Sequence, residues 1–297
     1  MTRARATLVG FSAVALWSLL ALFTVGTAPV PPLQLNAMAF AIGGGLGLAW
    51  VARSGGLRQL GGVPLRIYAF GTAGLFGYHF LYFSALRLAP PAEAGLIAYL
   101  WPLLIVLASG LLPGEHLRRG HVAGAAIAFA GAALIVAGGG RAGGAVQPGH
   151  LLALLCALTW AGYSLISRRL GAVPTAAVAV YCIATAVPSA LAHWALEPTV
   201  WPVGVTGWGA VVGLGLGPVG LAFYTWDIGV KRGDIQMLGT ASYAAPVLST
   251  LALVLAGQAA ATASLAMAAV LIAAGAGLAA RAGRALPRRV KAARSLP

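Results

Sequence analysis

The chain has 297 residues, of which 60% are hydrophobic and only 8% are charged. Because a soluble domain usually carries about 25% charged residues, this composition excludes a water-soluble globule and predicts a protein embedded in lipid. The formal net charge is +14, but the basic residues lie between apolar stretches or near the C-terminus. That distribution indicates membrane topology and no nucleic-acid partner.

Ten apolar stretches follow one another along the chain, each close to the roughly 20 residues that a helix needs to cross a bilayer. Segments rich in Pro and Gly separate them. The first stretch is longer than the apolar core of a secretory signal peptide, so we expect it to be retained. The predicted spans are residues 7–27, 33–52, 66–88, 93–112, 121–139, 150–169, 174–196, 205–230, 236–256 and 263–281.

The last five predicted spans read as a second copy of the first five. Trp17, in the run Ala-Leu-Trp, falls on Trp160 at an offset of 143. At an offset of 144, further positions recur: Tyr82 and Trp226, Tyr99 and Tyr243, Pro102 and Pro246. Because each copy has an odd number of spans, the two copies are expected to be inverted relative to each other.

The predicted fold is an all-α polytopic membrane protein with ten transmembrane helices, arranged as two inverted five-helix repeats around a central cavity. Residues 1–143 form the first repeat, 144–284 the second, and 285–297 a basic tail. With the N-terminus inside, 17 of the 19 Lys and Arg residues lie on the inner side and only Arg87 and Arg141 on the outer side. The positive-inside rule therefore predicts that both termini are cytoplasmic, and the excess of Arg over Lys, 17 to 2, indicates a bacterial source.

Several features of the spans predict breaks or gates, each with a plainer alternative. Pro102 and Pro246 lie inside the fourth and ninth spans, as passive kinks or as paired hinges. Asp227 and Lys231 are four residues apart, so they form a helical ion pair or a latch at the cytoplasmic mouth. The glycines around Pro218, at residues 213–220, mark a packing face or a broken helix.

His79 is the one deep titratable side chain, since no Asp or Glu falls at the middle of a span. Tyr78, His79 and Tyr82 share an arc of about 100° on a helix, which gives one aromatic face with polar tips. Such a face is expected to look into the protein or into a water-filled cavity, and not at lipid. His79 is then a hydrogen-bonding group in that cavity or a proton switch.

Other aromatic residues also lie near the middle of spans and are candidates for the lining of a substrate cavity. The alternative is the interfacial belt, which Trp50, Trp194, Trp201 and Trp208 fit because they lie near span ends. Aromatic faces suit a flat, mostly apolar solute and also hold ammonium groups. The predicted substrate-binding residues are Trp17, Tyr78, His79, Tyr82, Tyr99, Trp101, Trp160, Tyr163, Tyr224, Ser242 and Tyr243.

No HExxH, GxSxG or paired carboxylate occurs within a span, so neither an enzyme nor a metal site is expected. The chain has no phosphate-binding loop, and Cys156 and Cys182 form no CxxC pattern. We therefore expect no cofactor. The expected partners are a small-molecule substrate and the lipid bilayer, and the expected functional unit is a monomer.

The repeated Ala-Leu-Trp and Tyr-x-x-Pro marks resemble the drug/metabolite transporter superfamily, in particular its EamA members. Residues 77–86 (GYHFLYFSAL), 99–102 (YLWP) and 242–249 (SYAAPVLS) are similar to the YddG family of aromatic amino acid exporters. The resemblance implies an inner-membrane secondary exporter that moves aromatic and other neutral amino acids by alternating access. Because no carboxylate falls at the middle of a span, we expect it to be a facilitator without ion coupling. The alternative is a broad drug or metabolite exporter, coupled to protons.

Overall fold

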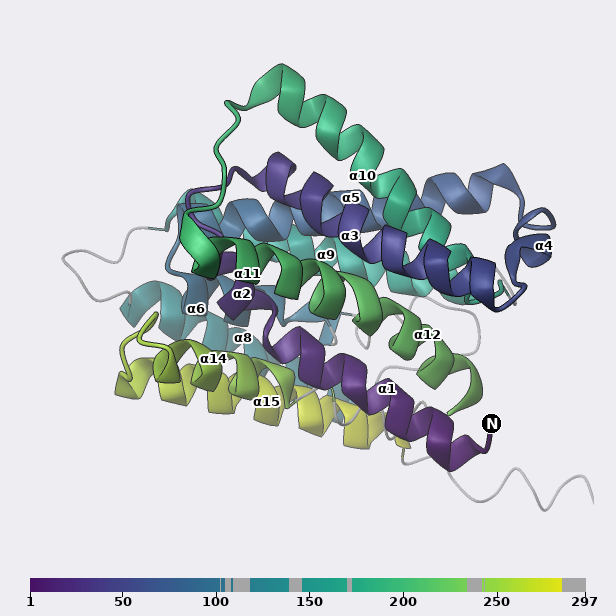
Figure 1. Ribbon diagram of the computed structural model, residues 1–297. Helices are drawn as coiled ribbons and strands as arrows, with labels where there is room; N and C mark the ends of the chain where they lie inside the picture. The colour runs from purple at the N-terminus through teal and green to yellow at the C-terminus, as the bar shows by residue number, and fades with distance from the viewer. Residues whose placement is uncertain are drawn as a thin grey trace, which may run out of the picture.

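The computed structural model describes residues 1–101, 103–104, 108, 118–138, 146–169, 173–233, 242 and 244–284, and these residues form helices and connections without a strand (Figure 1). Pro32 and Pro91 each open a helix, where the missing N–H costs nothing. The helices are α1 Arg3–Ser18, α2 Leu20–Gly26, α3 Pro32–Arg53, α4 Leu57–Leu60, α5 Leu65–Leu88, α6 Pro91–Ala98, α8 Arg119–Gly138, α9 Pro148–Arg169, α10 Ala177–Leu196, α11 Gly204–Leu216, η1 Gly217–Leu221, α12 Ala222–Arg232, α14 Ala245–Leu255 and α15 Ala263–Arg284.

Four helical stretches of the described residues are long and apolar enough to cross a bilayer: Arg3–Gly26, Pro32–Arg53, Ala177–Leu196 and Gly204–Gly229. Ala245–Leu255 and Ala263–Ala279 are apolar but shorter. The all-helical membrane architecture is therefore confirmed, whereas the number of ten spans stays a prediction.

Helices that occupy equivalent places in the two halves pack against each other, α3 with α10 and α8 with α15 (Figure 1). Gly44 of α3 lies against Ile183 of α10, and Gly47, further along α3, lies against Ala179, earlier in α10. The paired helices are thus antiparallel. The two other large contacts are α1 with α12 and α5 with α9. They are equivalent to each other, because α9 is the counterpart of α1 in the second half and α12 is the counterpart of α5.

Glycine permits the closest of these helix contacts. A Cβ on Gly124 of α8 would lie 2.4 Å from the carbonyl oxygen of Gly275 in α15, and a Cβ on Gly275 would lie 2.4 Å from that of Gly124. Close backbone approach of this kind replaces hydrophobic association, since lipid is as apolar as the side chains.

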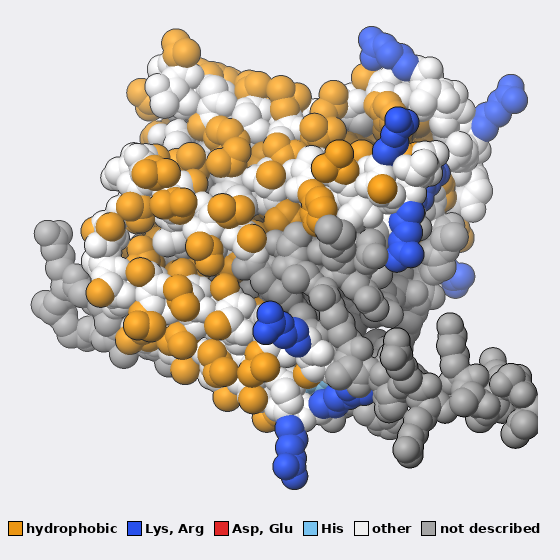
Figure 2. Space-filling view, turned by 90° about the horizontal axis from the view of Figure 1, so that it is seen from below, with side chains coloured by type: hydrophobic (Ala, Val, Ile, Leu, Met, Phe, Trp, Pro, Cys, Tyr) orange, Lys and Arg blue, Asp and Glu red, His pale blue; other side chains and the backbone are white. Residues whose placement is uncertain are grey.

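The surface separates apolar from basic side chains. Figure 2 shows hydrophobic side chains over most of one face, with Lys and Arg gathered toward the end where the N-terminus and α4 lie. Trp194 is 85% exposed and Trp201 61% exposed. Both lie near the ends of helices, as the expected aromatic belt requires.

The structure shows where the expected helix breaks fall. An α-helix gives way to a π-helix at η1, Gly217–Leu221, which agrees with a broken eighth span. Pro246, however, lies in the first turn of α14, which begins at Ala245, so it opens a helix where a kink inside a continuous helix was expected. α6 ends at Ala98, three residues short of Trp101, and Pro102 lies outside the described residues.

Candidate substrate cavity

A cavity lies between the two halves, and residues from both contribute to its wall. Six of the predicted substrate-binding residues are among them, together with two apolar residues. The lining residues are Trp17, Leu20, Tyr78, His79, Tyr99, Trp101, Trp160 and Phe223.

The cavity is small in this conformation. Its volume is about 20 Å³, which is enough for about one water molecule. Pockets that bind drug-sized ligands measure roughly 300–1,000 Å³. The rings that line it must therefore move apart before a solute larger than a water molecule can enter.

Equivalent residues of the two halves meet in the wall of this cavity. Trp17 and Trp160, offset by 143 positions, contact each other edge to face with ring centroids 6.3 Å apart and planes at 79°. The offset of 144 places His79 on Phe223, and these rings also touch, at 5.6 Å and 72°. The cavity thus lies where the two repeats face each other, and His79 is opposed by a phenyl ring.

His79 is 1% exposed and is surrounded by aromatic rings. Its Nδ1 lies 3.0 Å from the carbonyl oxygen of Leu75. Since a carbonyl only accepts, Nδ1 carries the proton, and Nε2 of the neutral ring remains an acceptor. Phe40 contacts the ring edge-on at 4.8 Å, and Phe83 at 5.6 Å. The imidazole is therefore held in one orientation.

The tyrosines of the predicted site form one face of α5 and the turn after α6. Tyr78 stacks on Tyr82 with centroids 6.0 Å apart and planes at 19°. The hydroxyl of Tyr82 is buried without a hydrogen-bond partner among the described residues. The hydroxyl of Tyr99 donates to the backbone carbonyl of Trp17 over 2.8 Å. These residues do face the protein interior, as the sequence predicted.

Trp160, which lines the cavity, contacts two further aromatic residues of the predicted site. Trp101 contacts it at 6.4 Å. Tyr163 stacks on it at 5.2 Å and also on Phe70 at 5.0 Å. Tyr163 thus forms a second layer behind the lining residues.

Tyr224 lies apart from this group. Its hydroxyl donates to the carbonyl of Gly43 over 3.0 Å, and its ring lies 5.9 Å from Trp50. Ser242 is buried, and Tyr243 lies outside the described residues. Sequence reasoning predicted Tyr224 but missed its neighbour Phe223, although the offset from His79 pointed to that position.

The predicted pair of Asp227 and Lys231 stays a prediction, because the side chain of Lys231 lies outside the described part of the chain. Asp227 Oδ2 accepts a short hydrogen bond from the hydroxyl of Thr175, just before α10. Asp227 therefore joins α12 to the start of α10.

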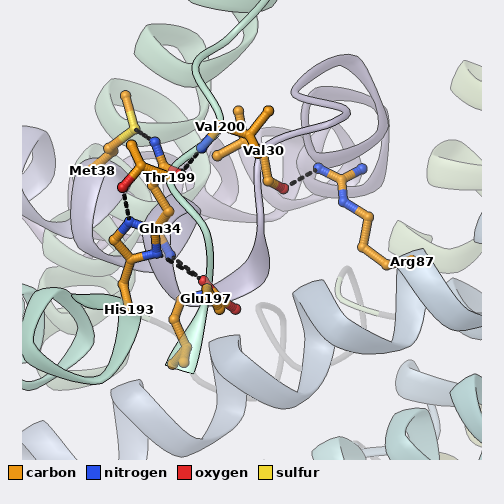
Figure 3. A network of polar contacts seen from close by, with 9 residues as sticks. Val30, Gln34, Met38, Arg87, His193, Glu197, Thr199 and Val200 are labelled. Atoms are coloured by element: carbon orange, nitrogen blue, oxygen red, sulfur yellow. Dashed lines mark hydrogen bonds and ion pairs between the residues drawn. The ribbon is translucent and has the colours of Figure 1, made fainter. Parts of the chain in front are cut away.

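Polar contacts at the opposite end from the N-terminus connect the helices there (Figure 3). The carboxylate of Glu197 accepts hydrogen bonds from the backbone N–H groups of Leu33 and Gln34, each within 3.1 Å, and contacts His193 Nδ1 at 3.1 Å. A carboxylate at a helix N-terminus stabilises the helix, and α3 has no side-chain cap of its own. Arg87 of α5 donates to the carbonyl of Val30, just before α3, over 3.1 Å. Hydrogen bonds therefore connect α3 and the chain before it to α5 and to the segment after α10.

A second contact between a histidine and a carboxylate at this end joins the two halves. Glu93, in the first turn of α6, accepts from Nε2 of His150 in α9 over 3.0 Å. His150 Nδ1 accepts from the backbone N–H of Gln147, so the proton of the neutral ring is on Nε2.

Comparison with known proteins supplies close relatives. The chain is 58% identical over 285 residues to the aromatic amino acid exporter YddG of Ancylobacter novellus, covering 94% of this chain and 98% of the relative. It is 28% identical over 269 residues to the protein of that name from Salmonella typhimurium, covering 84% and 88%. A crystal structure with 55% sequence identity matches with a TM-score of 0.76 over 95% of this chain and 100% of the other.

The model of the EamA-like transporter family matches twice, at residues 4–137 and 147–281. The boundary between the matches falls where the sequence repeat begins its second copy. The chain belongs to the EamA-like transporter family.

Proposed function

We propose that this protein exports aromatic and other neutral amino acids across the inner membrane of a bacterium. The observation that carries the proposal is the cavity between the halves, whose lining is mostly aromatic. Relatives at 58% and 28% identity are named aromatic amino acid exporters, which supports the same substrate class here.

The chemistry of the lining favours a zwitterion with an apolar side chain. None of the eight described lining residues carries a carboxylate, ammonium or guanidinium group. Trp and Tyr faces attract an ammonium group and pack edge to face on a substrate ring. His79 Nε2 and the tyrosine hydroxyls offer hydrogen bonds to the polar end, whereas a substrate with net charge would lack a counter-ion.

The proposed mechanism is alternating access between two inverted five-helix repeats, residues 1–143 and 144–284, with ten spans in all. The antiparallel packing of equivalent helices, α3 on α10 and α8 on α15, supports the inversion. The gathering of basic side chains at the end that carries the N-terminus (Figure 2) supports cytoplasmic termini. In the conformation described, the cavity has a volume of only about 20 Å³, and each half of the proposed cycle would open it further to one side.

We further propose that the transporter is a facilitator that moves its substrate down the concentration gradient. Proton-driven transporters usually place an Asp or Glu within the membrane, and the described lining has none. The alternative, a proton-coupled exporter of drugs and metabolites, would have to rely on His79 as its titratable group.

Counter-flow in proteoliposomes tests both statements. Liposomes loaded with unlabelled phenylalanine are expected to take up labelled phenylalanine, tryptophan and other neutral amino acids at the same rate with or without a pH gradient. Glutamate and lysine serve as controls and are expected to enter poorly. Strict dependence on the pH gradient would contradict facilitation, and uptake of lipophilic cations without amino acids would favour the drug exporter.

A further inference from the structure

The π-helical segment η1, Gly217–Leu221, leaves one backbone carbonyl in need of a donor. The N–H of Ala222 bonds to the carbonyl of Gly217, five residues back, whereas in a regular α-helix it would bond to Pro218. Pro218 itself has no N–H to donate to the preceding turn. The carbonyl of Pro218 is thus released from its usual helical donor.

Trp17 supplies that donor from another helix. Its indole Nε1 donates to the carbonyl of Pro218 over 3.2 Å, in a buried hydrogen bond. The carbonyl of Trp17 in turn accepts from the hydroxyl of Tyr99, the residue that follows the end of α6. Trp17 also lies two residues before Leu19, which separates α1 from α2. Trp17 therefore connects three interruptions of helical structure: the break between α1 and α2, the π-helical segment η1 and the end of α6.

η1 also contacts α3, and there the backbones of the two segments meet directly. A Cβ on Gly43 of α3 would lie 2.9 Å from the Cα of Gly220 and 3.0 Å from the carbonyl oxygen of Gly215. No side chain there can move aside. Trp17 is a side chain that touches η1 and also lines the cavity, so a ligand in the cavity reaches η1 through its indole.

We infer that Trp17 is a positioning residue that couples occupancy of the cavity to the shape of the α11–η1–α12 span. Its indole N–H holds η1 in the π-helical form while the cavity has the small volume seen here. When a substrate displaces the ring, the carbonyl of Pro218 loses its donor, and the span rearranges toward a regular α-helix, in which Ala222 donates to Pro218. This inference rests on the proposed transport function and adds the element through which binding changes conformation.

Trp17→Phe tests the coupling because it keeps an aromatic ring in the cavity and removes the N–H. In proteoliposomes, the maximal rate of phenylalanine counter-flow is expected to fall about fivefold, the effect of one buried hydrogen bond, with less than about a twofold change in KM. Hydrogen exchange at the backbone amides of residues 217 and 219–223 is expected to change in the same variant. Trp208→Phe, at a 44% exposed position of α11, is the matched control and should alter neither quantity.

Pro218→Ala tests the same hydrogen bond at its acceptor residue. It restores the N–H at position 218, so η1 is expected to become α-helical with the exchange pattern of Trp17→Phe. The double variant should then add no further loss of rate, because both changes remove one interaction. This variant also decides the question if Trp17→Phe does not fold.

Three results would overturn the inference: unchanged exchange in η1, a loss confined to KM, or additive effects in the double variant. Failure of the proposed function is distinguishable from these results. A wild-type protein that transports no amino acid would refute the transport proposal, while hydrogen exchange in η1 would still show whether Trp17 holds the π-helix.

Discussion

Trp17 and Trp160 occupy equivalent positions in the two repeats and contact each other with ring centroids 6.3 Å apart. Since both residues line the cavity, equivalent positions of the two repeats meet in the cavity wall. Around it the lining is not symmetric, since His79 faces Phe223. An amino acid has one polar and one apolar end, so we expect this asymmetry to give it a preferred orientation in the cavity.

His79→Phe is predicted to separate folding from transport. Phe223 already occupies the equivalent position, and Phe40 and Phe83 already surround the imidazole, so a phenyl ring should pack there with little change in thermal stability. Loss of the Nε2 acceptor should lower the counter-flow rate about tenfold, the cost of one buried hydrogen bond to a substrate. Rates equal to wild type would show that the imidazole does not contact the substrate.

Gly275→Ala is predicted to weaken the contact between α8 and α15. A Cβ at Gly275 would meet backbone atoms of Gly124 and Ala128 at 2.4 and 2.6 Å, and overpacking of this kind costs about 1–3 kcal/mol. The thermal unfolding midpoint in detergent should therefore fall.

Gly277→Ala is the control for that measurement, because it lies two residues away on the same helix and its Cβ would meet nothing within 4 Å. Its midpoint should match wild type or rise slightly, since alanine favours helix over glycine. Equal effects of the two changes would argue against a packed α8–α15 interface.

The sequence predicted the helices well because apolar length and proline punctuation both act locally. The span expected at 33–52 is α3, Pro32–Arg53. The side chains around the cavity were harder to predict, because inside a membrane an apolar residue has the same composition signal whether it faces lipid or protein. The sequence predicted Tyr224 in the lining of the cavity but not Phe223. Neighbouring residues on a helix point about 100° apart, so when Phe223 lines the cavity, Tyr224 faces α3.

Glu197→Gln is predicted to destabilise the end of the molecule shown in Figure 3. The carboxylate accepts from the N–H groups of Leu33 and Gln34 and is 14% exposed. Gln has a similar shape but no charge for the α3 N-terminus and one fewer acceptor oxygen. We expect a loss of about 1 kcal/mol, measured as a lower unfolding midpoint, with the substrate KM unchanged because the site is remote from the cavity. A shift in KM alone would contradict a capping role.

Cross-linking across the Glu93–His150 pair is predicted to stop transport. Glu93 belongs to α6 in the first repeat and His150 to α9 in the second, and their side chains meet at 3.0 Å. If the repeats rock to open the outer mouth, these helix ends must separate in every cycle, so a covalent link should hold the mouth closed.

The variant Glu93→Cys/His150→Cys is made in a background of Cys156→Ala and Cys182→Ala, because both natural cysteines are free thiols. After treatment with a short, reducible dithiol cross-linker, counter-flow should fall to background and return on reduction. Each single-cysteine variant, treated in the same way, should keep its rate. Full transport by the cross-linked protein would show that α6 and α9 move as one body, and the boundary between the moving parts would then have to lie elsewhere.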